Sequence, residues 1–130
     1  MRRFGPPLLL MGVIFFFSAQ PDLNSGLGVW DTIGRKLIHA AIYGTLFLLW
    51  WRALGWPASP LAAAAITLLY AASDEYHQTF IEGRHGSPLD VAIDASGILI
   101  AYGLATRRRG TRAGRRPRAG GPPPAAARRP

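Results

Sequence analysis

The stretch that decides the fold class is residues 8–17, which read LLLMGVIFFF. A second stretch of the same kind, residues 61–70, reads LAAAAITLLY. A helix at the surface of a soluble protein needs a polar face, and neither stretch provides one. Both stretches therefore argue against a soluble four-helix bundle and favour helices that lie in lipid.

Charged residues are widely spaced through the first 106 residues. Uncharged runs of 18, 15, 21 and 12 residues begin after Arg3, Lys36, Arg52 and Asp94. A helix needs about 20 mainly apolar residues to cross a hydrocarbon core of about 30 Å. We therefore expect an all-α, four-transmembrane-helix bundle with crossings near residues 4–18, 33–51, 59–72 and 88–106. The first and third segments have the most uniformly apolar sequences. The hydropathy of the fourth segment gives the weakest indication of a crossing, because that segment carries two aspartates.

The basic charge of the chain is concentrated at its C-terminal end. The formal net charge is +8, yet residues 107–130 hold nine arginines and no acid, so residues 1–106 carry a net charge of −1. This distribution argues against a nucleic-acid-binding domain. Residues 107–130 are Arg, Pro, Gly and Ala with a single Thr, and such a composition does not bury a core. We expect a transmembrane domain at 1–106 and a disordered, cytoplasmic tail at 107–130.

The distribution of Lys and Arg predicts the orientation. With the N-terminus inside, the cytoplasmic segments hold 12 basic residues and the outer segments hold three. The positive-inside rule then predicts a multi-pass protein of the cell membrane with both termini cytoplasmic. The first apolar run also has the shape of a signal peptide, but Phe16, Phe17 and Pro21 at its end favour an uncleaved helix. The absence of Cys excludes a disulfide scaffold, a Cys-ligated zinc site and a thiol nucleophile.

Acidic and histidine side chains gather on the outer side in this topology. His39 and Asp94 each lie 12 residues from the inner end of their helices, so both are expected about 18 Å above the cytoplasmic face. Asp74 and Asp90 each lie 16 residues from their inner ends, at about 24 Å. Lipid offers no hydrogen bonds, so these groups are expected to converge in one pocket that opens outward, either a ligand site or a structural polar plug. The candidate binding residues are His39, Tyr43, Asp74, Glu75, His77, Gln78, Arg84, Asp90 and Asp94.

Three classes of function fit such a pocket. A binding protein would hold an anionic envelope ligand, such as a cell-wall precursor, a polyprenyl-phosphate lipid or a glycopeptide, through bidentate hydrogen bonds from Arg84. A membrane enzyme, a metal-assisted phosphatase or transferase acting on a polyprenyl pyrophosphate, would use Glu75 or His77 as its catalytic base. Its divalent metal ion would be Mg²⁺ or Zn²⁺, with alternative ligand sets of Asp74, Glu75 and Asp90 or of His39, His77 and a carboxylate. A small transporter is the third class, although the sequence shows no internal repeat.

One pattern of residues resembles a known family. It comprises Ser18-Ala19-Gln20-Pro21, Asp31, Lys36, His39, Tyr43, residues 74–80 (DEYHQTF), Gly83-Arg84, Ser87, Asp90, Asp94 and Gly97. Their order and spacing resemble the VanZ-like family of small polytopic bacterial membrane proteins, which is named for a protein linked to teicoplanin resistance. The resemblance covers about residues 10–104 and implies a place in the cell envelope and a link to antibiotic resistance, but no defined reaction.

The chain departs from the family pattern at two positions. Family members often have Pro before the Gly-Arg pair, where this chain has Glu82, and Asn where this chain has Asp94. The first departure adds a charge beside Arg84. The second places an acid where the family has a neutral amide.

Overall fold

The structure, a computed structural model, describes residues 2–21, 29–57, 59–84 and 86–113. These residues form four α-helices and no strand: α1 (Gly5–Ser18), α2 (Val29–Gly55), α3 (Pro60–Gln78) and α4 (Pro88–Ala113). The all-α prediction is confirmed. The expected disorder of residues 114–130 lies outside the described residues, as do Asp22 and His85.

Local sequence accounts for where the helices begin and end. Proline, which lacks an N–H and has a fixed φ, stands in the first turns of α1 and α3 and opens α4. The Ser87 hydroxyl oxygen accepts a hydrogen bond from the Leu89 N–H at 3.2 Å and so caps α4. Gly55 ends α2 with a φ of 104°, a conformation that glycine adopts without steric cost.

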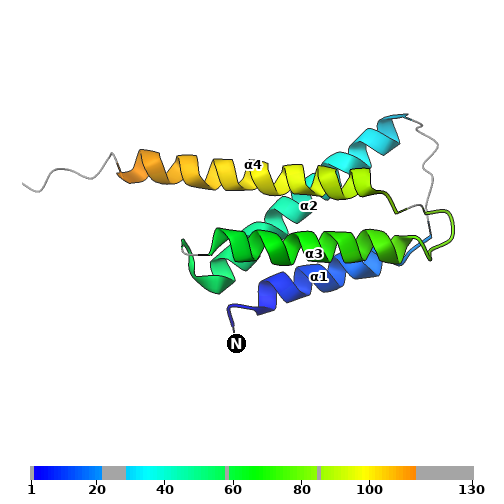
Figure 1. The fold of residues 1–130 in the computed structure, drawn as a ribbon, viewed down its shortest axis with the longest axis horizontal. Coiled ribbons are helices and arrows are strands. Elements are labelled where there is room, and N and C mark those ends of the chain that lie inside the picture. The colour runs from blue at the N-terminus through cyan, green and yellow to red at the C-terminus, as the bar shows by residue number, and fades with distance from the viewer. Residues whose placement is uncertain (1, 22–28, 58, 85, 114–130) are drawn as a thin grey trace, which may run out of the picture.

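The helices run up and down the bundle in chain order (Figure 1). Helix α2 crosses the others and packs against all three, most extensively against α4. Helix α1 contacts α2 and α3, and among the described residues it makes no contact with α4. The start of α1, the α2–α3 turn and the end of α4 lie at one end of the bundle, while the loop of residues 79–87 lies at the other.

Small residues allow α2 and α4 to approach closely. Gly44 and Gly97 are both buried, and a Cβ added to Gly44 would lie 2.8 Å from the Gly97 carbonyl oxygen. A Cβ added to Gly97 would lie 2.9 Å from the Ala40 Cα. Each helix thus presents two small residues four positions apart, Ala40 with Gly44 and Gly97 with Ala101, the pattern that packs helices tightly in membranes.

The buried core lies in two clusters along the bundle. Phe47, Trp51 and Ile98 form one cluster with two alanines near the α2–α3 turn. Tyr43 and Leu46 belong to the other, which includes residues of α1 and α3. Both clusters are built around α2, in agreement with its central position.

Much of the apolar surface is exposed. Leu61 is 84% exposed, Leu69 72% and Leu99 70%, and three consecutive phenylalanines of α1 are each more than half exposed. Exposed apolar area on this scale marks a surface covered by another apolar phase, and a bilayer is such a phase. Two segments, Thr32–Gly55 of α2 and Pro88–Arg108 of α4, are long and apolar enough to cross one.

The two candidate spans are not the two crossings that were expected to be the most apolar. Helix α1 has only 14 residues, about 21 Å of helix, which is shorter than the hydrocarbon core. Helix α3 ends in a polar turn that lowers its hydropathy. Helix α4 is apolar enough to cross because it holds only two acids before its basic end. One of them, Asp94, is fully buried within the bundle. Helix α4 also continues seven residues beyond the expected boundary at Thr106.

Candidate functional site

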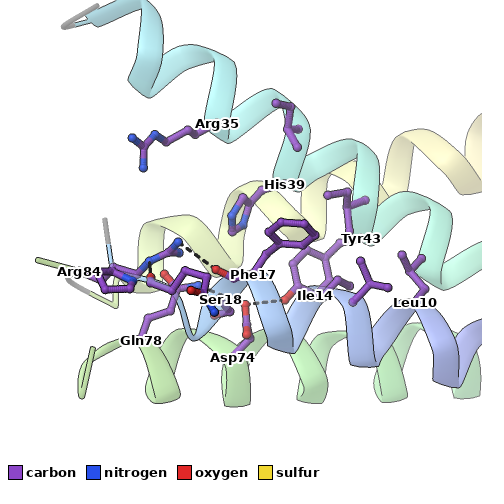
Figure 2. Close-up of a pocket in the computed structure, with 15 residues that line it drawn as sticks. Leu10, Ile14, Phe17, Ser18, Arg35, His39, Tyr43, Asp74, Gln78 and Arg84 are labelled. Atoms are coloured by element: carbon purple, nitrogen blue, oxygen red, sulfur yellow. Dashed lines mark hydrogen bonds between the residues drawn. The ribbon is translucent and has the colours of Figure 1, made fainter. Parts of the chain in front are cut away.

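A cavity of about 600 Å³ opens between α1, α2 and α3 beside the loop of residues 79–87. Figure 2 shows its lining residues. One wall is apolar and consists of Leu10, Val13, Ile14 and Phe17 of α1 with Ile38 and Ile42 of α2. The other wall is polar and consists of Ser18, Gln20, Arg35, His39, Tyr43, Asp74, Gln78 and Arg84. The cavity is therefore amphiphilic, with its cations and its acid at one end.

Asp74 is held at the inner wall of this cavity by two neutral donors. Its Oδ2 accepts hydrogen bonds from the Tyr43 hydroxyl and from the Gln78 Nε2, each at 3.1 Å (Figure 2). All three side chains are buried. Oδ1 of Asp74 and Oγ of Ser18 are also buried, and neither has a hydrogen-bond partner among the described residues. Both atoms therefore lie beneath the surface of the cavity wall and not on it.

Arg84 reaches back from the loop to the end of α1. Its Nε donates to the Gln20 carbonyl oxygen at 2.9 Å, and its Nη2 donates to the Phe17 carbonyl oxygen at 3.1 Å (Figure 2). Phe17 belongs to the last turn of α1, and Gln20 lies two residues beyond the end of that helix. No carboxylate of the described residues forms an ion pair with Arg84, so main-chain oxygens fix the guanidinium without neutralising it.

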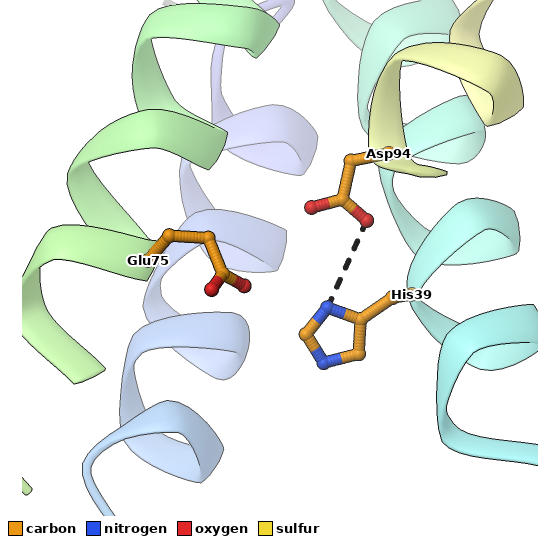
Figure 3. A group of neighbouring side chains, drawn as sticks. All are labelled: His39, Glu75 and Asp94. Atoms are coloured by element: carbon orange, nitrogen blue, oxygen red, sulfur yellow. Dashed lines mark ion pairs between the residues drawn. The ribbon is translucent and has the colours of Figure 1, made fainter. Parts of the chain in front are cut away.

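A second polar group, His39, Glu75 and Asp94, brings together α2, α3 and α4 (Figure 3). Nδ1 of His39 lies 3.7 Å from Oδ1 of Asp94. One ligand atom of each of the three residues lies within 4.8 Å of the others. Among the described residues, this is the only group with the residue types and spacing to hold a metal ion.

Glu75 is fixed by the loop that follows α3. Its Oε2 accepts a hydrogen bond from the Ser87 backbone N–H at 2.9 Å. Gly86 packs so closely on α3 that an added Cβ would lie 3.0 Å from the Glu75 carbonyl carbon and closer still to the carbonyl oxygen. A glycine before Ser87 therefore lets the loop approach Glu75.

Two of the expected site residues lie apart from both groups. Asp90 forms an ion pair and hydrogen bond with Lys36, one turn before His39 on α2. The His77 ring stacks on Phe15 of α1, with 4.9 Å between ring centroids. Asp90 was expected in the pocket because it is four residues before Asp94, and His77 because it is three residues after Asp74. A separation of three residues still spans enough of the α3 surface for Asp74 and His77 to face different neighbours.

The structure does not bring together either of the two metal-ligand sets expected from the sequence. His77 does not join His39, and Asp90 is engaged by Lys36, so neither the Zn²⁺ nor the Mg²⁺ combination converges. The expected common height of His39 and Asp94 is confirmed, since the two side chains face each other. Asp74, Gln78, Tyr43, His39 and Arg84 all line one cavity, as expected.

Several groups that contribute to the site are not among the candidate residues predicted from the sequence. Lys36 is three residues before His39, and this i, i+3 spacing places both on one helix face. Arg35 lines the cavity. The Ser87 N–H and the carbonyls of Phe17 and Gln20 are main-chain groups, and no residue type signals them.

Comparison with known proteins agrees with the exposed apolar surface and the two candidate spans. The VanZ/LLP1 family model matches residues 7–109. The chain is 35% identical over 99 residues to the uncharacterized membrane protein YwnJ of Bacillus subtilis (strain 168), an alignment that covers 71% of this chain and 68% of that protein. No solved structure matches the chain. With most of its length matched by the family model, the chain is a membrane protein that belongs to the VanZ/LLP1 family.

Proposed function

We propose that this protein binds an anionic amphiphile of the cell envelope, of the polyprenyl-phosphate type, in the cavity between α1, α2 and α3. The observation that carries the proposal is the division of that cavity into an apolar wall and a polar end. Its volume of about 600 Å³ falls in the range of pockets that hold small ligands. An apolar chain fits along α1 and α2, and a charged head group fits beside Arg84.

The charges at the polar end favour an anion. Arg84 lines this end of the cavity, and Asp74 is the single acid among the described lining residues. The negative charge of Asp74 is moderated by hydrogen bonds from Tyr43 and Gln78. A guanidinium has five N–H donors in a planar fork, which matches phosphate and carboxylate groups.

The proposal includes a topology in which all four helices cross the membrane and both termini are cytoplasmic. Residues 107–113 extend α4 with four arginines at the end of the bundle where α1 begins. The positive-inside rule assigns that end to the cytoplasm. The cavity and the loop of residues 79–87 then face outward.

Direct binding tests the proposal. Tag-free protein in detergent is titrated with a polyprenyl phosphate and, as a matched control ligand, with the corresponding neutral polyprenol. We expect saturable binding of the phosphate, and binding at least about tenfold weaker for the polyprenol and for Arg84→Gln, because each change removes a charge-assisted hydrogen bond. Arg52→Gln, at the other end of the bundle, serves as the control variant and is expected to bind as the wild type. Equal binding of the two lipids would contradict the proposal.

A metal-assisted phosphatase or transferase is the second candidate, favoured by the position of Glu75 beside His39 and Asp94. In this candidate Glu75 is a free catalytic base, an alternative to its role as a metal ligand, since His77 is turned toward Phe15. Release of phosphate from a polyprenyl pyrophosphate by the purified protein, abolished by Glu75→Gln, would favour the enzyme over the binding protein.

A further inference from the structure

We infer that His39, Glu75 and Asp94 bind a divalent transition-metal ion, with Zn²⁺ as the best-fitting example. The three side chains come from three helices and share only His39 with the lining of the lipid cavity. The inference thus stands apart from the proposed lipid ligand, and a negative result for one leaves the other in place.

The strongest observation is the state of Asp94. Its side chain is fully buried, with 0% exposure. Neither Oδ1 nor Oδ2 accepts a hydrogen bond from the described residues. Its ion-pair partner, Nδ1 of His39, is 3.7 Å away from Oδ1, which is too far for a hydrogen bond (Figure 3). A buried carboxylate that accepts no hydrogen bond is costly, and a bound cation removes that cost.

The charges around the group support a divalent cation. Glu75 and Asp94 are two buried acids, and Glu75 receives one hydrogen bond, from a neutral backbone N–H. Two basic side chains near the group bind other partners. Lys36 pairs with Asp90, and Arg84 donates hydrogen bonds to main-chain carbonyls. A divalent ion with two carboxylates and a neutral imidazole gives a site of zero net charge.

The ligand types select among metals. One imidazole nitrogen and two carboxylate oxygens suit Zn²⁺, whereas Mg²⁺ prefers oxygen ligands and retains its waters. Ligand atoms of a tetrahedral zinc site lie about 3.4 Å apart for bonds of about 2.1 Å. The present separations of up to 4.8 Å require side-chain movements of about 1 Å, with no change of helix position. Three protein ligands leave a fourth position open for water or substrate.

The test is zinc binding by the tag-free full-length protein in detergent. We expect one Zn²⁺ per chain, measured by elemental analysis, and competition with a chromophoric chelator gives its affinity. Asp94→Asn, Glu75→Gln and His39→Gln are each expected to weaken binding at least about tenfold, since even outer partners of metal ligands contribute that much. The matched controls Glu82→Gln, an exposed acid, and His77→Gln, a histidine outside the group, are expected to bind as the wild type. Mg²⁺ is expected to compete poorly.

X-ray absorption at the zinc edge of the wild-type protein tests the inference without any variant, and so it does not depend on whether a variant folds. For wild-type protein the spectrum is expected to show a single imidazole among nitrogen and oxygen ligands. Two or more imidazoles would place the ion at another set of histidines and overturn the assignment. Absence of saturable zinc binding, or unchanged binding by the Asp94→Asn and Glu75→Gln variants, would also overturn it and leave the three residues as a structural polar network.

Discussion

Replacement of Gly97 by Ala tests the close approach of α2 and α4 on which the polar groups depend. The added Cβ would lie 2.9 Å from the Ala40 Cα and closer to the Ala40 carbonyl group. Non-bonded carbon atoms are best separated by about 3.5–4.0 Å, so the two helices must move apart by about 1 Å. Overpacking of this kind costs about 1–3 kcal/mol of unfolding free energy. Because the obstacle is backbone, no side-chain rotation relieves it.

Gly103→Ala is the matched control on the same helix. A Cβ at Gly103 meets nothing within 4 Å among the described residues. Alanine favours a helix over glycine by about 1 kcal/mol, so this variant is expected to be as stable as the wild type or slightly more stable. The assay is equilibrium unfolding of the detergent-purified protein in increasing SDS, followed by circular dichroism. Equal stability of the two variants would refute the close approach of α2 and α4.

The Gly97→Ala substitution is also expected to affect the zinc site proposed above. Ala40 follows His39 directly, and Gly97 lies one turn after Asp94. Separation of the helices at Gly97 therefore separates the two side chains, which now lie 3.7 Å apart. We expect Gly97→Ala to weaken zinc binding and Gly103→Ala to leave it unchanged.

Three other predictions concern the site, the topology and the tail. Tyr43→Phe removes a donor to the buried Asp74 and is expected to lower the unfolding free energy by about 1–3 kcal/mol in the same assay; an unchanged value would contradict the hydrogen bond. The chain has no natural Cys, so a Cys introduced at Ser87 is expected to react with an impermeant maleimide in intact cells, and one at Thr111 only after lysis; the reverse pattern would contradict the topology. A chain that ends at Ala113 is expected to insert and to unfold at the same SDS concentration as the full chain, since the removed residues include no large apolar side chain; loss of stability would show that the tail packs on the bundle.

The number and approximate position of the helices could be predicted from the sequence because charge spacing and apolar runs are properties of each helix alone. His39 and Asp94 could be predicted to lie at the same level in the bundle, because the constant rise per residue gives the distance of each side chain from the inner end of its helix. Depth says nothing about how each helix is rotated about its axis. That rotation decides that His77 meets Phe15 and that Asp90 meets Lys36.

The helix rotation is set by packing between helices that are far apart in the sequence. Ala40, Gly44 and Gly97 bring α2 against α4, and this contact directs Asp94 toward His39. Small residues in apolar helices are common, so their spacing alone did not single out this crossing. The positions of main-chain donors and acceptors depend on the path of the loop. The hydrogen bond from the Ser87 N–H to Glu75 is an example, and the type of residue at position 87 does not predict it.

The most direct test of the proposed lipid cavity is photo-crosslinking with a polyprenyl phosphate that carries a diazirine on its apolar chain. After irradiation of the detergent-solubilised protein, mass spectrometry maps the adducts. We predict adducts on the apolar wall, at residues such as Val13 and Ile42, which disappear with excess unlabelled polyprenyl phosphate but persist with excess polyprenol. Adducts spread over the exposed apolar side chains, such as Leu61 and Leu99, and insensitive to either competitor would contradict a specific site and indicate only the annular contact of any membrane protein with lipid.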